Sequence, residues 1–426
     1  MSKVLVSRGM LKGSVQVPAS KSAAHRAILC AALAKGTSRL SNLSENEDIE
    51  ATISAVRALG AVVEKDGSAL IVDGTNTGKA KTAAIDCNES GSTLRFLIPV
   101  AAALGIKTVF TGAGRLPVRP QKAYMKLLPQ KGVELLCKKD VFLPLTVKGQ
   151  LQSGVYEVGG DVSSQFISGL LFALPLLKGN SEIILTTPLQ SAGYVQLTLE
   201  QLEQYGIEIE KTENGYRIPG AQSYKACDLA LESDWSQAAF FLAAGALGGD
   251  VTCIGLNKDS AQGDKKIVSL LKQMGADIAW QKDGSLHCQS NGSLYDFEVN
   301  ASQIPDLVPI LSVLAAFADG TTLITGARRL RYKESDRLSA MADNLARMGI
   351  DVQEQEDGLV ISGTDGVTGK ALNGYKDHRI VMAMSIAAAK LFGDEPLTIT
   401  DAHSINKSYP NFFEQFNRLG GDAHVV

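Results

Sequence analysis

The feature that most constrains the fold is a segment that recurs six times along the chain. Each copy is a helix-like stretch that closes at a glycine before a short strand-like stretch, as in "VRALGAVVE". The six glycines are 72, 74, 69, 74 and 71 residues apart, so six units of similar length fill the 426 residues. Helices commonly end at a left-handed residue, a conformation that glycine adopts at low cost. We therefore predict a helix end at each of these positions: Gly60, Gly132, Gly206, Gly275, Gly349 and Gly420.

A second helix, apolar on nearly all sides, recurs at the same period, and such a helix is typical of a buried position. The six predicted buried helices lie within 20–34, 88–104, 163–177, 234–247, 302–318 and 376–391. Short stretches rich in β-branched residues follow them and predict strands, at 37–43, 107–112, 181–187, 250–256, 321–326 and 396–401. The glycine-closed helices are more charged and are expected to face solvent. The pattern predicts an α/β fold of closed multi-unit domains, because the period exceeds that of open solenoids.

Polar residues gather at the starts of the predicted buried helices. Ser20, Ser90, Ser236 and Ser302 are predicted N-caps, since a serine hydroxyl accepts from free N–H groups there. Capping does not explain Lys21 and Arg26, because a cation is unfavourable at the positive end of a helix dipole. An anionic ligand would resolve this conflict, since helix N-termini and arginine side chains both suit phosphate and carboxylate groups.

Further cations lie at corresponding places in the repeat. They are Arg115, Arg119, Arg328, Arg329, Arg331, Lys333, Arg337, Arg379 and Lys407. Within "RRLRYKESDR" a solvated charge run paired with Glu334 and Asp336 is the alternative interpretation. Taken together, the cations favour one anion-binding cleft.

Composition and motifs exclude several other classes. The 42 Lys and Arg against 45 Asp and Glu argue against a nucleic-acid or polybasic membrane role. The start of the chain has no secretory h-region, and no apolar run reaches the about 20 residues that span a bilayer. The six cysteines form no C-x-x-C pair, so we expect no metal site, reduced thiols and a cytoplasmic location. G-x-x-x-x-G-K-[ST], G-x-S-x-G and H-E-x-x-H motifs do not occur.

At least seven separated motifs, spread over essentially the full chain, resemble the 5-enolpyruvylshikimate-3-phosphate synthase family of enolpyruvyl transferases. They include "SKSAAHR", "RLPVRP", "GDVSSQF", "LQSAGYV", "IPDLVP", "KESDR", "DHR" and "NKSYP". The resemblance implies two globular domains, each of three βαβαββ units in an inverse α/β barrel-like arrangement, with the substrates between them. The domains would be 21–227, on the shikimate-3-phosphate side, and 228–426, on the phosphoenolpyruvate side. Residues 1–20 would cross over to the second domain.

The resemblance also implies site residues for both substrates. Ser22 and Arg26 would hold the shikimate carboxylate, and Gln165 would stack near the ring. The other implied shikimate-3-phosphate contacts are Ser163, Ser164, Ser191, Tyr194 and Lys333. The implied phosphoenolpyruvate contacts are Lys21, Gly91, Arg119, Gln165, Arg337, Arg379 and Lys407.

The implied reaction moves the enolpyruvyl group to the 5-hydroxyl of shikimate-3-phosphate and releases phosphate through a tetrahedral intermediate, as a step in aromatic amino-acid biosynthesis. Asp306 would be the base and orienter at the 5-hydroxyl, Glu334 a proton-transfer residue and Lys21 an assisting acid. No cofactor is implied, and family members are often monomers. From the residues alone, the favoured interpretations are a helix cap for Asp306 and a salt bridge for Glu334.

The chain departs from the family pattern at four positions. Glu89 stands where asparagine is usual, Ser92 replaces threonine, Gly193 replaces proline, and Arg329 replaces asparagine or glutamate. Two alternatives remain: the sister enzymes that transfer enolpyruvate to UDP-N-acetylglucosamine, and a catalytically silent anion-binding repeat protein. The loop "GAGRLPVRP" lacks the catalytic cysteine usual in the sister enzymes, and the presence of Lys21, Asp306 and Glu334 argues against a silent protein.

Overall fold

The computed structural model describes residues 2–426. Internal contacts divide them into two compact units: a continuous unit, Ala19–Leu231, and a discontinuous unit that joins the residues up to Pro18 with Glu232–Val426. Each unit has a hydrophobic core of its own.

The continuous unit contains α1 to α6 and β3 to β14. Its helices are α1 (Lys21–Leu33), α2 (Glu47–Ala58), α3 (Gly91–Ala103), α4 (Lys122–Leu127), α5 (Ser164–Ala173) and α6 (Ala192–Gln204). Its strands are β3 (Thr37–Ser41), β4 (Val62–Asp66), β5 (Ala69–Asp73), β6 (Thr82–Asp86), β7 (Lys107–Thr111), β8 (Val133–Lys138), β9 (Val141–Gly149), β10 (Val155–Val158), β11 (Ser181–Leu185), β12 (Glu210–Thr212), β13 (Gly215–Ile218) and β14 (Leu229–Ala230).

The discontinuous unit contains the remaining elements. Its helices are α7 (Trp235–Ala246), α8 (Ile267–Gln273), α9 (Val308–Ala316), α10 (Arg337–Arg347), α11 (His378–Ala387) and α12 (Phe412–Arg418). Its strands are β1 (Lys3–Ser7), β2 (Lys12–Gln16), β15 (Asp250–Ile254), β16 (Asp277–Trp280), β17 (Leu286–Gln289), β18 (Leu294–Tyr295), β19 (Glu298–Asn300), β20 (Ala318–Asp319), β21 (Thr321–Thr325), β22 (Asp351–Gln355), β23 (Gly358–Ser362), β24 (Ala371–Leu372), β25 (Leu397–Thr400) and β26 (Asp422–Val425).

Among residues 2–426, six four-stranded sheets share one pairing pattern, three in each unit. Each sheet has one parallel pair and two antiparallel pairs, and in four of the six sheets the strands of the parallel pair bracket a buried helix in the chain. In β6-β7-β9-β8, for example, β6 and β7 are parallel and α3 connects them. The sixfold pattern of the sequence is therefore a sixfold repeat of structure, and the predicted α/β class is confirmed.

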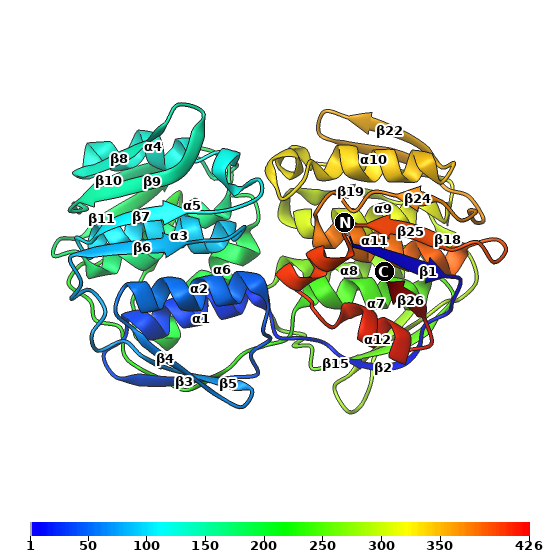
Figure 1. Cartoon of the computed structure of the whole chain (residues 1–426), viewed down its shortest axis with the longest axis horizontal. Helices are drawn as coiled ribbons and strands as arrows, with labels where there is room; N and C mark the ends of the chain where they lie inside the picture. Colours follow the sequence, from blue (N-terminus) through cyan, green and yellow to red (C-terminus); the bar gives the residue numbers. More distant parts are fainter. Residues whose placement is uncertain (1) are drawn as a thin grey trace. The chain divides into compact units, whose positions relative to one another are not determined.

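Two of the six sheets exchange their first strands. β2 immediately precedes α1 in the chain but pairs in parallel with β15, whereas β14 precedes α7 and pairs in parallel with β3. β1 also belongs with the end of the chain, between β25 and β26, and Figure 1 shows this dark blue strand among orange and red elements. In each unit, one sheet is therefore completed by a strand that comes from a distant part of the sequence.

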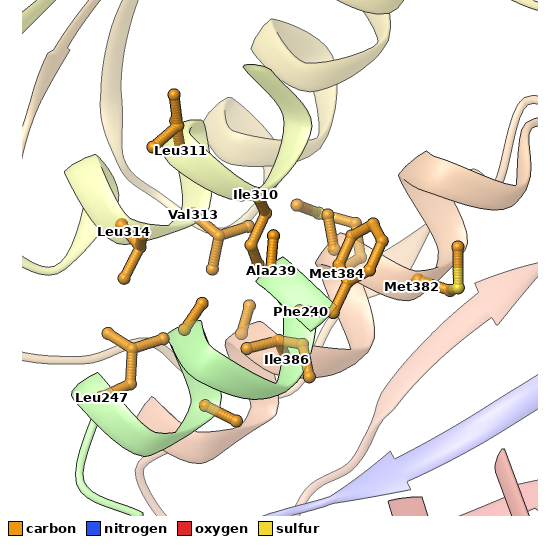
Figure 2. Close-up of a cluster of buried hydrophobic side chains, with 14 of the residues drawn as sticks. Ala239, Phe240, Leu247, Ile310, Leu311, Val313, Leu314, Met382, Met384 and Ile386 are labelled. Carbon is orange, nitrogen blue, oxygen red and sulfur yellow. The ribbon is translucent and has the colours of Figure 1, made fainter. Parts of the chain in front are cut away.

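The predicted helix ends and buried helices are confirmed. All six glycines have a positive φ, between 73° and 110°. The buried helices are α1, α3, α5, α7, α9 and α11, and a strand follows each of them as predicted. In the core of the discontinuous unit Phe240, Ile310 and Met384 pack together from α7, α9 and α11 (Figure 2). The glycine-closed α10 is amphipathic as expected, because it buries Leu338 and Leu345 and leaves Arg347 half exposed.

The caps of the buried helices follow the prediction only in part. Ser20 and Ser90 accept from backbone N–H groups three residues on, as predicted. Ser236 is not the cap of α7: Asp234 is, and it accepts from the backbone N–H groups of Ser236 and Gln237. The predicted cap at Ser302 is also wrong. Asn300 caps the short 3-10 turn that contains Ser302, and α9 has no side-chain cap.

Candidate functional site

Lys21 is the first residue of α1, and its charge is balanced by an acid on the neighbouring helix. Its Nζ lies 2.6 Å from Oδ2 of Asp48 on α2, and both side chains are less than one fifth exposed. The pair places an ammonium group beside the N-terminus of a buried helix, where anions are favoured. Asp48 therefore offsets the conflict between a cation and the helix dipole that the sequence raised.

Arg26 ties α1 to α6 from a buried position. Its guanidinium donates to the carbonyl of Ser22 at 2.6 Å, the carbonyl of Tyr194 at 2.8 Å and the hydroxyl of Thr198 at 2.8 Å. It also lies over the ring of Phe96, 5.1 Å from the centroid. Burial lowers the pKa of Arg26 to about 10. These bonds bring the predicted residues Ser22, Arg26 and Tyr194 together and use three of the five N–H donors of the guanidinium.

Gln165, the second residue of α5, is held by two residues of α3. Its Nε2 donates to the Ser92 hydroxyl at 2.9 Å, and its Oε1 accepts from Arg95 at 2.7 Å. Ser163 caps α5, and Ser164 is buried at the first helical position. These two hydrogen bonds therefore fix the orientation of the Gln165 amide near the N-termini of α3 and α5.

Ser191 stands at the N-cap position of α6 with a left-handed φ of 53°. For a serine this conformation is uncommon and marks a position that the surroundings impose. The residue is buried, and Tyr194 follows it within the first turn of the helix.

Gly91 and Arg119 are in close contact. A Cβ on Gly91 would lie 2.9 Å from one terminal nitrogen of Arg119 and 3.0 Å from its Cζ. The glycine thus leaves room for a buried guanidinium at the first residue of α3. Glu89, in place of the usual asparagine, turns against Gly114 of the following loop, where a Cβ would lie 2.2 Å from its Oε2.

Gly91→Ala tests the expectation from the family resemblance that Gly91 and Arg119 contact phosphoenolpyruvate. A methyl group there would displace the Arg119 guanidinium. Loss of a charged contact costs about 1.5–3 kcal/mol, so on that expectation KM for phosphoenolpyruvate rises by about tenfold. Steady-state kinetics with each substrate varied in turn measures this, and KM for shikimate-3-phosphate should change less than about twofold. Gly67→Ala is the control: a Cβ there meets nothing within 4 Å, and any strain of alanine at its φ of 59° stays in the exposed turn between β4 and β5. An unchanged KM for phosphoenolpyruvate would contradict the assignment.

In the discontinuous unit, Asp306 is surrounded by three cations. Its Oδ1 lies 2.9 Å from Arg337 and 3.6 Å from Lys333, and its Oδ2 lies 3.4 Å from Arg379. Burial alone would raise the pKa of Asp306, but Arg379, Lys333 and Arg337 together hold it well below the usual range. The carboxylate is therefore ionised and does not cap α9.

Arg337, the first residue of α10, is held by three carboxylates. Its Nε lies 2.8 Å from Asp377 and a terminal nitrogen lies 2.8 Å from Glu334, in addition to the contact with Asp306. Its side chain is 2% exposed and that of Asp377 is 0% exposed. Burial lowers the pKa of Arg337, but Asp377, Glu334 and Asp306 raise it above the ordinary value. Glu334 is thus a salt-bridge partner within the same cluster as Asp306.

The remaining predicted cations of this unit lie on neighbouring elements. Arg379, on α11, donates to the Ser236 hydroxyl at 2.9 Å and to the backbone carbonyl of Asp306 at 3.3 Å. Lys407 is buried and donates to the carbonyl of Lys376 at 2.8 Å. Arg329, at one of the departures from the family pattern, donates to the carbonyl of Ser302 at 2.8 Å.

The arginine-rich run divides between the two interpretations that the sequence left open. Arg328 pairs with Glu356, and Arg331 pairs with Asp336 and Glu354, as a solvated charge run would. Lys333 and Arg337 instead point to Asp306. Groups of three or more metal-ligating side chains do not occur within residues 2–426.

Sequence reasoning missed three charged residues that hold the predicted ones. Asp48 resembles an ordinary first-turn acid of an amphipathic helix, so no signal distinguished it. Arg95 could have been found, because a lone arginine stands within the apolar run "TLRFLIPV". Asp377 immediately precedes the buried helix in "KDHR", where its N-cap position was a usable signal.

Comparison with known proteins gives one family. The model of the EPSP synthase (3-phosphoshikimate 1-carboxyvinyltransferase) family matches residues 6–416. The 3-phosphoshikimate 1-carboxyvinyltransferases of Clostridium perfringens and Clostridium kluyveri are each 44% identical to this chain; the alignments cover 99% of the chain and 99% and 98%, respectively, of those proteins. The structure of EPSP synthase from Acinetobacter baumannii matches with a TM-score of 0.84 at 28% identity, over all of both chains.

The match to the Acinetobacter baumannii structure over the whole chain agrees with the observed fold. None of the helices described in residues 2–426 is long and apolar enough to cross a membrane. The chain belongs to the EPSP synthase family, and it is a 3-phosphoshikimate 1-carboxyvinyltransferase that transfers the enolpyruvyl group of phosphoenolpyruvate to shikimate-3-phosphate in aromatic amino-acid biosynthesis.

Proposed function

We propose that residues of both units act on one pair of substrates. In the continuous unit, Ser22, Arg26, Gln165 and Tyr194 would bind shikimate-3-phosphate together with further residues, which are Ser163, Ser164 and Ser191. Arg26 supports this role, because two of its N–H donors are not used by the bonds to Ser22, Tyr194 and Thr198. The continuous unit, predicted as 21–227, would carry the shikimate-3-phosphate side. The discontinuous unit, predicted as 228–426 with residues 1–20, would carry the phosphoenolpyruvate side.

Phosphoenolpyruvate would take its cations from both units. Arg337, Arg379 and Lys407 would bind its carboxylate and phosphate, with Lys21, Gly91, Arg119 and Gln165 from the continuous unit, and Lys333 would bind on the shikimate-3-phosphate side. The observation that carries the proposal is the cluster of three cations around Asp306. An arriving dianion would compete with Asp306 for these cations, which would weaken their hold on its carboxylate.

The cluster then offers a route for the protons. As the cations turn to the substrate, the pKa of Asp306 rises toward the usual range, so Asp306 accepts the proton of the 5-hydroxyl as that oxygen attacks C2 of phosphoenolpyruvate. Lys21, as the assisting acid, supplies a proton that Glu334 transfers to C3, which gives the tetrahedral intermediate. Glu334 then takes one proton back from C3 and returns it to Lys21 as the bond from C2 to the phosphate oxygen breaks, which restores the double bond. The departing phosphate takes up the proton held by Asp306.

Phosphate release tests the substrate pair. The purified chain with phosphoenolpyruvate and shikimate-3-phosphate is expected to liberate one phosphate for each enolpyruvyl group transferred. UDP-N-acetylglucosamine in place of shikimate-3-phosphate is expected to give none. Turnover with the nucleotide sugar would favour the sister reaction, and anion binding without turnover would favour a silent protein.

We further propose a monomeric, cytoplasmic enzyme that needs no cofactor. Each charged cluster is completed by side chains of a single chain, so a second copy is not required for the assignment. None of the six cysteines forms a disulfide, which suits a reducing compartment. Analytical sedimentation at micromolar concentration tests whether the protein is a monomer.

A further inference from the structure

A cavity of about 480 Å³ opens on the discontinuous unit, and none of the residues assigned to the substrates lines it. Its walls come from the start of α7, the turn before α8, α8 itself and the end of β16. Two tryptophans lie in its lining, Trp235 and Trp280, with ring centroids 6.0 Å apart in an edge-to-face arrangement. The volume lies within the about 300–1,000 Å³ that is usual for small-molecule sites.

Four exposed lysines also line the cavity. Lys258 comes from the loop after β15, Lys265 and Lys266 from the turn before α8, and Lys272 from the last turn of α8. Within residues 2–426 none of their ammonium groups forms an ion pair with a carboxylate. By contrast, Arg328 and Arg331 of the same unit each pair with a glutamate.

The arrangement selects for one chemical class. Aromatic walls favour a flat apolar ring, which stacks on tryptophan faces or edges. Four ammonium groups around the same cavity repel one another, and a negative group on the ligand would offset that repulsion. We propose that this cavity is a second binding site, for an anion built on a flat aromatic ring.

The position of Trp235 connects this site to the chain crossing between the units. Its backbone N–H donates to Gln262 at 3.0 Å, and Gln262 in turn donates to Glu232 and to the carbonyl of Ser233, residues of the crossing itself. The indole Nε1 donates to the carbonyl of Asn257 at 3.0 Å, which fixes the ring against the cavity wall. These hydrogen bonds connect Trp235, in the cavity wall, to Glu232 and Ser233, where the chain enters the discontinuous unit.

The two tryptophans are the only ones in the chain, so intrinsic tryptophan emission reports on this cavity. The experiment titrates the full chain with the sulfonate probe 1-anilinonaphthalene-8-sulfonate and follows tryptophan quenching. The matched neutral probe is N-phenyl-1-naphthylamine, which has the same rings without the charge. We expect the sulfonate to bind at least about fivefold more tightly than the neutral probe, with an affinity that falls as salt is added.

The variant Lys258→Glu/Lys272→Glu places opposite charges on two sides of the cavity, and we expect it to weaken sulfonate binding at least about tenfold without changing turnover. Lys370→Glu is the matched control, because this lysine is exposed in the same unit and does not line the cavity. Its binding should stay within about twofold of the unaltered chain. Saturating phosphoenolpyruvate and shikimate-3-phosphate should leave the titration unchanged.

Three results would overturn the proposal. They are equal affinity for the two probes, equal affinity of the double variant and the Lys370→Glu control, and displacement of the sulfonate by the substrates. The first two would leave the lysines as solvated surface charges, and the third would move the bound probe to the substrate site. The assay of phosphate release is read separately, so its outcome does not affect this test.

Discussion

Asp306→Asn is expected to lower kcat about 1,000-fold while KM for either substrate changes less than about threefold. Asparagine has nearly the same shape as aspartate, and its amide oxygen can still accept from Arg337, while Arg379 keeps its bond to the backbone carbonyl of residue 306. It cannot take up the proton of the 5-hydroxyl, and a positioned proton acceptor contributes about 10²–10⁴-fold to a rate. Steady-state kinetics with both substrates varied gives the comparison.

The direction of the KM change adds a second test of the same variant. The substitution removes one negative charge from among Arg337, Arg379 and Lys333, so the local potential becomes more positive. Phosphoenolpyruvate, an anion, should therefore bind no more weakly than before. Asp365→Asn, on an exposed loop, is the control and should leave both constants unchanged. A KM that rises as much as kcat falls would assign Asp306 to binding rather than to proton transfer.

The repeat was visible in the sequence because each helix end requires the same backbone conformation. Gly60 and Gly420, at the two ends of the series, both have a φ near 100°, which side chains with a Cβ rarely adopt. The pairing of β2 with β15 and of β14 with β3 was not encoded so locally. β14 has only two residues, and its choice of partner depends on tertiary contacts rather than on its own pattern.

The helix caps show how a local pattern can mislead. Asp234 and Ser236 both suit an N-cap, and only the backbone dihedrals decide that Asp234 takes the position. In the fifth unit, Pro305 begins a 3-10 turn before α9, so Ser302 lies well ahead of the helix that it was predicted to cap. A serine near a helix start is thus a weaker signal than a glycine at a helix end.

The cations of the site were predictable because a charge beside an apolar helix contradicts its surroundings. Their anionic partners were not predictable. Asp48 is far in sequence from Lys21, which it pairs with, and Asp377 is far in sequence from Arg337. A buried cation must be paired, but the sequence does not say which carboxylate approaches it. That choice depends on which helices pack together, and only the fold determines it.

Arg337→Met is expected to lower the free energy of unfolding of the discontinuous unit by about 3–5 kcal/mol, because it leaves Asp377, Glu334 and Asp306 close together without their shared cation. Asp377→Asn should also destabilise the unit, although asparagine can still cap α11, since it leaves a buried guanidinium short of one partner. Urea unfolding followed by tryptophan emission measures both, because Trp235 and Trp280 both lie in this unit.

The double variant Arg337→Met/Asp377→Asn distinguishes a specific pair from general damage to the core. Removing both members of a buried pair leaves fewer uncompensated charges than removing one, so the double loss should be at least about 1 kcal/mol smaller than the sum of the single losses. The control is Arg347→Met, whose pair with Asp343 is half exposed, and the expected loss there is below about 1 kcal/mol. Strictly additive losses at Arg337 and Asp377 would show that the two side chains stabilise the unit independently, and Asp377 would then not be the residue that holds Arg337 in place for the substrate.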